Sequence, residues 1–153
     1  MSWIEVSSQA DLDALMDTFG RFHDGCLKEM HMWTESYVDK DLSMSCPFHL
    51  DTHVRLLIQR QFETPSAIEL LFDGVMHINV APSQDNYDSI IFDATLLFQD
   101  SIFYWADVRN WSPNQEDSAS ATWIGGSNLK WRDASEWMGE SMRYGPQGKI
   151  MIS

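Results

Sequence analysis

The stretch RFHDGC, residues 21–26, brings a histidine, an aspartate and a cysteine close together. A cysteine nucleophile needs a nearby base, and a histidine base needs a third group to orient it. Neighbours in an extended chain point to opposite sides, so Asp24 cannot simply orient His23, and Cys26 is out of phase with His23 unless Gly25 bends the chain. The pattern favours a structural corner in which Phe22 docks in the core and His23 or Asp24 bonds free backbone groups at the end of the helix. His23 with Asp24 stays the alternative for a small enzyme or ligand-binding domain.

A second group of reactive residues lies in CPFHLDTH, residues 46–53. Cys46, His49 and His53, with Cys26 brought close by a hairpin, would make a tetrahedral Cys₂His₂ zinc site. Their spacing matches no familiar zinc finger, and small buried cysteines are common without any function. We therefore predict no metal and no cofactor.

Two histidines, His53 and His77, form the alternative metal or ligand site. Both stand at the same distance from the turn expected at Pro65, which would place them side by side on neighbouring strands. Paired histidines can bind a metal or a phosphate. The chain contains no glycine-rich phosphate loop, no H-E-x-x-H and no G-x-S-x-G, so it lacks the common signatures of nucleotide enzymes, zinc proteases and serine hydrolases.

The composition indicates one folded domain, residues 1–153, with an unusual charge. The apolar share is 44% and the net charge is −13. Nucleic acids and anionic membranes bind clustered Lys and Arg, so this charge argues against both as partners, whereas it steers a basic protein partner toward the chain. No apolar run is long enough to span a membrane, and the start lacks a secretory signal pattern. We expect a cytoplasmic protein with free thiols.

Apolar periodicity predicts the elements that must position these residues. Ser8 caps an expected helix that ends near Gly20, and Leu12, Leu15 and Phe19 form its apolar stripe. After it, period-two alternation predicts successive strands with short turns. The expected strand regions are a hairpin over 26–46 turning near Ser36, with Cys26 opposite Cys46, then 54–62, 68–80, 90–98 and 102–108, and a last strand or hairpin within 122–131. Residues 133–145 are predicted to form a short C-terminal helix.

This order of elements predicts an α+β fold, an antiparallel β-meander with the N-terminal helix packed on one face and a short C-terminal helix. The other face mixes polar and apolar residues. On it we place the acidic candidate contact residues Glu69, Asp73, Asp93 and Asp107. Aromatic residues concentrate in the C-terminal half, where Phe103 and Trp105 share one strand face. That face needs cover from within the chain or from a partner protein, and we include both residues in the candidate contact set.

The helix, the corner at Phe22, His23 and Asp24, and the strand IELLFDGVMHINV together resemble small bacterial proteins of unknown function, some of which look like immunity proteins for polymorphic toxins. The resemblance covers about residues 20–108. It implies a sheet-rich α+β domain that binds protein rather than turning over a substrate.

The expected function is therefore a non-catalytic protein-binding module, with a toxin-neutralising immunity protein as its specific form. Acidic side chains would steer a basic partner and aromatic anchors would supply affinity. The alternatives are the metal- or ligand-binding domain or enzyme described above, and a homo-oligomer with a self-complementary patch.

Overall fold

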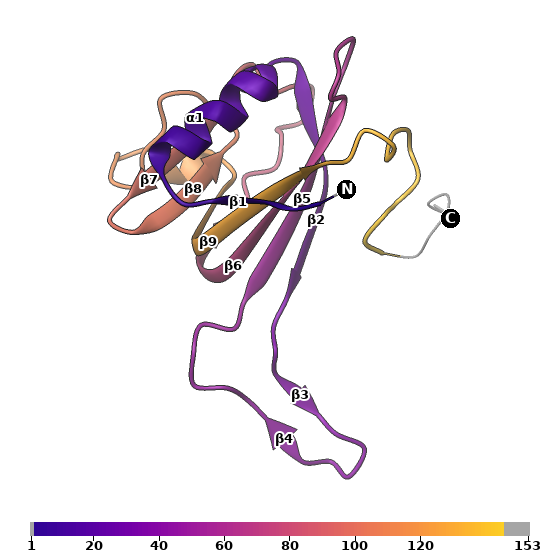
Figure 1. Cartoon of the computed structure of the whole chain (residues 1–153), viewed down its shortest axis with the longest axis vertical. Coiled ribbons are helices and arrows are strands. Elements are labelled where there is room, and N and C mark those ends of the chain that lie inside the picture. The colour runs from indigo at the N-terminus through magenta and orange to yellow at the C-terminus, as the bar shows by residue number, and fades with distance from the viewer. Residues whose placement is uncertain (1, 146–153) are drawn as a thin grey trace.

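The computed structural model describes residues 2–145 and has the predicted α+β class, with a mostly antiparallel sheet and one α-helix near the N-terminus (Figure 1). The elements are β1 (Ile4–Val6), α1 (Gln9–Thr18), η1 (Gly20–Phe22), β2 (Gly25–Trp33), β3 (Tyr37–Val38), β4 (Met44–Ser45), β5 (His53–Arg60), β6 (Ala67–Asn79), β7 (Thr95–Gln99), β8 (Ile102–Ala106), η2 (Ser118–Ser120) and β9 (Trp123–Asp133). No helix among the described residues has the length and apolar content needed to cross a bilayer.

The helix α1 begins and ends where its sequence predicts. The Ser8 side chain accepts a hydrogen bond from the backbone N–H of Asp11, and the Asp11 carboxylate accepts bonds from Ser7. These bonds satisfy donors that the first turn leaves free. Gly20 follows with φ of +57°, a conformation that suits glycine, so the chain leaves the helix and turns toward the sheet.

The main sheet has the strand order β2-β5-β6-β9-β8-β7, and β1 pairs with β9 beside β8. The neighbouring strands β2, β5 and β6 follow in chain order, as do β7 and β8. The meander is interrupted by β9, which enters between β6 and β8. Because β9 pairs along its length with β6 on one side and with β8 and β1 on the other, the last strand joins the two halves of the sheet.

The core lies between α1 and one face of the sheet (Figure 1). Leu12 and Leu15 of α1, with Phe19 directly after the helix, pack on alternate residues of the strands. The strand residues buried in this core include Val54, Leu56, Ile58, Ile68, Leu70, Phe72, Phe103, Trp105 and Ile124. Burial of such side chains contributes about 1.5–3 kcal/mol each, so this face is the main source of stability.

The expected hairpin over 26–46 is wrong. Strand β2 pairs with β5 rather than with the segment after Ser36, and Cys26 lies opposite Gln59. The residues after β2 instead leave the sheet and form a separate two-stranded hairpin, β3 with β4. Both cysteines are exposed and free. Alternation alone predicts a strand face but does not identify the strand that lies opposite.

The pairing of His53 with His77 is also wrong, because the β5–β6 turn is centred near Glu63 and not at Pro65. In the observed register Val54 faces Phe72, which places His53 next to Asp73. Moving the turn by two residues keeps the same apolar residues on the same face, so the hydrophobic pattern cannot distinguish the two registers. His77 lies beyond a register irregularity at Val75 and stacks on Trp123, with ring centroids 4.0 Å apart.

The C-terminal segment, residues 134–145, is not helical as expected but forms an extended strap across the outer face of the sheet. Side chains of the sheet bind its backbone in place of helical hydrogen bonds. The Gln59 amide donates to the carbonyl of Trp137, and the Glu29 carboxylate accepts the N–H groups of Arg143 and Tyr144. These bonds satisfy the backbone groups that a helix would have paired internally.

Candidate functional site

Residues 34–52 form an arm that extends from the end of the sheet opposite α1 (Figure 1). Its tip is a turn organised by Asp39, whose carboxylate accepts the N–H groups of Asp41 and Ser43. The Asp39 backbone also bonds Ser43 and Leu42, and Leu42 has φ of +66°. An aspartate at the start of a tight turn satisfies the local backbone, so the arm holds its shape by short-range bonds.

The arm exposes several large apolar side chains to solvent. Phe48 is fully exposed and Leu42 is 87% exposed. The large apolar side chains of the arm that are at least half exposed are Tyr37, Val38, Leu42, Met44, Phe48 and Leu50. Single exposed apolar residues are ordinary, but a group of this kind on one projection is typical of a protein-contact surface.

The same arm is acidic. Its charged residues are Glu35, Asp39, Lys40, Asp41 and Asp51, four acids and one base, which gives −3 with His49 neutral. The arm therefore combines apolar contact area with the negative sign of the whole chain, which carries −13. An interface with an apolar centre and a charged margin has this composition.

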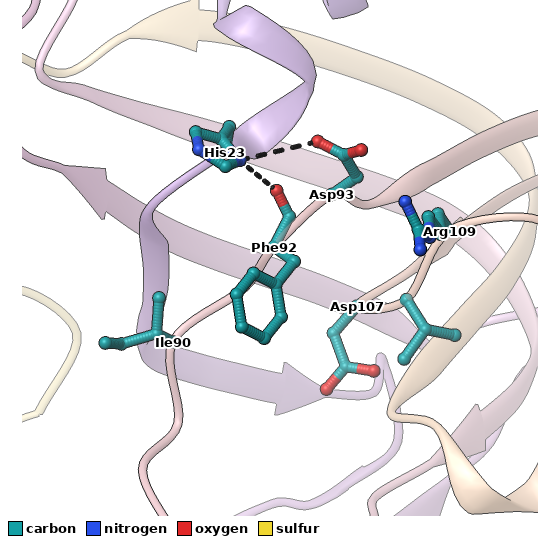
Figure 2. A pocket seen from close by; sticks show the side chains of 7 residues that line it. His23, Ile90, Phe92, Asp93, Asp107 and Arg109 are labelled. Atoms are coloured by element: carbon teal, nitrogen blue, oxygen red, sulfur yellow. Dashed lines mark hydrogen bonds and ion pairs between the residues drawn. The ribbon is translucent and has the colours of Figure 1, made fainter.

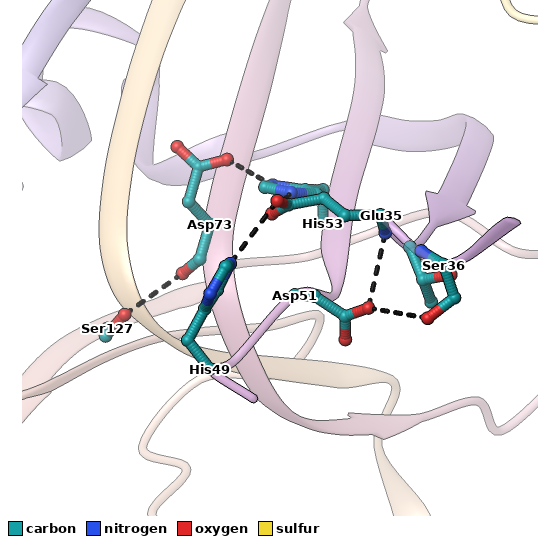
Figure 3. A network of polar contacts seen from close by, with 8 residues as sticks. Glu35, Ser36, His49, Asp51, His53, Asp73 and Ser127 are labelled. Atoms are coloured by element: carbon teal, nitrogen blue, oxygen red, sulfur yellow. Dashed lines mark hydrogen bonds and ion pairs between the residues drawn. The ribbon is translucent and has the colours of Figure 1, made fainter. Parts of the chain in front are cut away.

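The base of the arm is tied to the sheet through His53 (Figure 3). The Nδ1 atom of His53 lies 2.6 Å from Oδ1 of Asp73 in β6, and its Nε2 atom lies 2.9 Å from Oε2 of Glu35 in the arm. His49 contacts the second oxygen of Glu35 at 3.3 Å. Trp33 stacks on the His53 ring with centroids 5.2 Å apart. The ring thus stands between two carboxylates from different parts of the chain.

This arrangement changes the protonation of its members. Burial disfavours the charged ring, but the hydrogen bonds and charges of Asp73 and Glu35 outweigh it, so the pKa of His53 is raised above 6.5. The hydrogen bond from His53 is the largest influence on Glu35 and lowers the pKa of that carboxyl below 4.5. Near neutral pH the cluster favours an imidazolium between two carboxylates.

The structure buries three of the six predicted contact residues. Glu69 and Trp105 have no exposed surface, and Phe103 is 5% exposed, so none of them can touch a partner in this structure. Phe103 and Trp105 are covered from within the chain, because they face the α1 side of the sheet. The expectation that Glu69, Phe103 and Trp105 contact a partner is therefore corrected. The apolar face of β8 is covered by other parts of the same chain.

Glu69 has a structural role instead. Its carboxylate accepts a hydrogen bond from Nε of Arg132 at 2.6 Å, and Arg55 lies 3.9 Å from its other oxygen. Tyr144 of the strap packs over Arg55 with 4.7 Å from the guanidinium to the ring centroid. Burial and the nearby Glu69 carboxylate raise the pKa of Tyr144. A buried carboxylate needs such compensation, so this pattern fits an anchor for the outer face and the strap.

The other three predicted residues are half-buried, and two of them line the same hollow (Figure 2). Asp93 and Asp107 line a hollow of about 530 Å³ together with His23. The other lining residues are Ile90, Phe92, Val108 and Arg109. Burial raises the pKa of Asp107, and the N–H of Thr122 donates to its carboxylate. Asp73 lies elsewhere, at the arm base.

The RFHDGC stretch forms the corner that the sequence favours, with a different partner. Phe22 is buried in the core, and Nδ1 of His23 lies 2.6 Å from the carbonyl oxygen of Phe92. The His23 ring therefore binds the loop before β7 rather than the end of the helix. It also lies 3.7 Å from Asp93, so His23 joins the hollow, whereas Cys26 does not line it.

No group of three or more His, Cys, Asp and Glu side chains within residues 2–145 is arranged to hold a metal ion. The sequence predictions missed the arm base, because it depends on Glu35 meeting His53 and Asp73 across a long excursion. The signal that could have suggested an excursion is the polar tip DKD, residues 39–41, followed by Pro47.

No protein-family model, curated protein or solved structure matches this chain. The arm, its base and the hollow are the features of the molecule that point to a function.

Proposed function

We propose that the chain is a non-catalytic protein-binding module whose arm contacts a basic partner protein. The observation that carries this proposal is the set of six apolar side chains, each at least half exposed, on one projecting hairpin. Moving an exposed Leu, Met or Phe side chain into an interface contributes about 1.5–3 kcal/mol. Several contributions of this size offset the cost of association, about 4–15 kcal/mol.

Charge supports a basic partner over a second copy of the chain. Contact between two arms would bring together two surfaces of −3 on two molecules of −13. Like charges at an interface oppose association, whereas a basic surface is attracted from a distance. Added salt should therefore weaken binding mainly by slowing the association rate.

A basic toxin is the specific partner that we propose to test first. The resemblance of residues 20–108 to immunity proteins supports this choice, and so does the acidic, apolar arm. In that case the mechanism is stoichiometric, because the module covers part of the toxin and performs no chemistry of its own. The protein encoded next to this gene is the first candidate for such a toxin.

The test compares two matched substitutions in binding to the purified neighbouring gene product, measured by titration calorimetry. Leu42 in the arm and Phe62 in the β5–β6 turn are both strongly exposed, at 87% and 94%, and both have positive φ. Asparagine tolerates that backbone conformation, so Leu42→Asn and Phe62→Asn should both fold normally.

We expect Leu42→Asn to weaken binding tenfold or more, with Phe48→Asn behaving in the same way, and Phe62→Asn to leave binding unchanged. A tenfold loss corresponds to about 1.4 kcal/mol, a modest value for an interface anchor. Equal affinities for the two arm variants and Phe62→Asn would refute the arm as the contact element. Absence of any binding, together with failure to protect cells from the neighbouring product, would refute the immunity form.

The hollow at His23 supports a second candidate function, binding of a small organic cation with an apolar body. Two carboxylates and one arginine give its lining a charge of −1 with His23 neutral, and Ile90, Phe92 and Val108 provide apolar walls. The test is an NMR titration with phenethylamine against neutral 2-phenylethanol. Shifts for the amine that disappear in Asp93→Asn but persist in the surface control Asp85→Asn would support it, and equal shifts for amine and alcohol would refute it.

A further inference from the structure

We propose that His53 is a proton-controlled clamp that holds the arm in one orientation to the sheet. This inference rests on the proposed function only in its last step, where orientation of the arm affects partner binding. The clamp itself follows from the geometry of His53, Glu35 and Asp73 (Figure 3).

The geometry indicates that the ring carries two protons. Carboxylate oxygens stand 2.6 Å from Nδ1 and 2.9 Å from Nε2, both within hydrogen-bond distance. An ionised carboxylate only accepts hydrogen bonds, and a neutral imidazole has a single N–H. Both contacts can therefore be hydrogen bonds at the same time only when His53 is an imidazolium.

The ring of His53 has neighbours from β6, from the arm and from β2. Asp73 comes from β6, and Glu35 comes from the arm with His49 behind it. On β2 the neighbour is the uncharged Trp33 ring. Arg55 and His31 lie against that Trp33 ring, at 5.2 Å and 4.9 Å from its centroid. The two carboxylates are the groups that contact the ring nitrogens directly.

Loss of one proton should release the arm side of the clamp. Asp73 is held beside His53 by the paired strands β5 and β6, and its contact is the shorter one, so the remaining proton stays on Nδ1. The lone pair of Nε2 then faces the Glu35 carboxylate and repels it. Glu35 has a side chain that is 44% exposed, so it can turn into water.

Release of Glu35 affects the outgoing leg of the arm more than the return leg. The N–H of Val75 in β6 donates to the carbonyl of Thr52 at 2.9 Å, which fixes the return leg independently of His53. The outgoing leg has its tie through Glu35, while its bonds to Asp51 join the two legs only to each other. The arm should therefore keep its hairpin and its attachment but sample a wider range of angles.

The direction of the pKa changes defines the pH range. The pKa of His53 is raised above 6.5 and that of Glu35 is lowered below 4.5, so both charges are present between these values. The clamp is complete there and opens as the pH rises through the raised pKa of His53. If only the clamped orientation binds the partner, the apparent affinity equals the affinity of the clamped form multiplied by the fraction of molecules that remain clamped.

The test measures the arm without any partner. Cys26 and Cys46 are replaced by serine, and fluorophores are placed on Ser43→Cys in the arm and Ala14→Cys in α1 for single-molecule energy transfer. We expect one narrow distance distribution at pH 6 and a clearly broader one at pH 9. His53→Gln and Glu35→Gln should be broad at both pH values. His49→Gln is the control and should keep the pH response.

A distribution that does not change between pH 6 and pH 9, or a response that survives in both His53→Gln and Glu35→Gln, would overturn the clamp. An NMR titration of the His53 ring provides a second readout, and a pKa at or below 6.5 would also overturn it. Partner binding is measured separately. A pH-dependent arm without partner binding would support the clamp and count against the proposed function.

Discussion

Two regions of this chain are rich in large apolar side chains, and the fold treats them in opposite ways. The C-terminal strands β8 and β9, with the loop between them, bury Trp105, Trp111 and Trp123. The arm of residues 34–52 leaves Tyr37, Leu42 and Phe48 in solvent. The difference teaches that apolar content does not locate the core. It locates surface that must be covered. In β8 and β9 other parts of the chain cover that surface, whereas in the arm nothing within the described residues does.

The reason lies in the neighbours of each region. Strand β9 has paired strands on both sides, and α1 covers one face of β8 while Trp111 and Trp123 pack against Tyr104 on the other. The arm pairs only with itself, through two short strands. A two-stranded hairpin cannot bury both of its faces alone, so its apolar residues remain available for another molecule.

Substitution of Trp105 should have the largest effect on stability. Trp105→Ala removes a fully buried side chain, and we expect a loss of about 3–5 kcal/mol in the free energy of unfolding. Trp105→Phe should cost much less, about 1 kcal/mol, because the indole N–H is buried without a hydrogen-bond partner. Urea denaturation monitored by circular dichroism measures both. Similar losses for the two variants would contradict the proposed role of apolar burial.

Glu69→Gln should come next. The change leaves Arg132 without its carboxylate partner beneath the strap. We expect a loss of about 3 kcal/mol in the free energy of unfolding, which is the low end for a broken buried ion pair because Arg132 is partly exposed. Denaturation in urea gives the value, and hydrogen exchange should show faster exchange at Arg143 and Tyr144 as the strap loosens. Glu116→Gln, at an exposed position, is the control and should change little.

Substitution of His53 at the base of the arm should have a smaller effect on stability, and this effect should depend on pH. Because the pKa of His53 is raised on folding, its stabilisation is complete below pH 6.5 and is lost as the pH rises through the raised value. The difference in unfolding free energy between the wild type and His53→Gln should therefore be about 1–3 kcal/mol at pH 6 and shrink toward pH 9. A difference that grows with pH would have the wrong sign and would contradict the imidazolium assignment.

The smallest effect on stability is expected in the arm itself. Leu42→Asn and Phe48→Asn should change the unfolding free energy by no more than about 0.5 kcal/mol, because neither side chain is buried. The same variants are expected to weaken partner binding, so stability and binding should respond in opposite regions of the molecule. A loss of several kcal/mol at Leu42 would show that the arm is packed rather than free.

The sequence patterns predicted much of the fold and less of the site. The sequence predicted the Ser8 cap, the apolar stripe of α1 and the alternation of β5, β6 and β8, since each depends on residues close in the chain. The candidate sites mixed correct and incorrect elements. His23 and Asp93 line one hollow although no sequence pattern connects them, Glu69 is buried, and His53 has Asp73 for a neighbour instead of His77.

The sequence by itself determined the extent of α1, the strand character of β5, β6 and β8, and the apolar side of these strands, because these depend on local caps and on periods of 3.6 and 2. Only the tertiary structure decided that β2 pairs with β5, that β9 enters between β6 and β8, and that residues 34–52 leave the sheet. A period of two is unchanged by a register shift of two residues and contains no information about the opposite strand. The arm and the His53 cluster arise from those long-range choices.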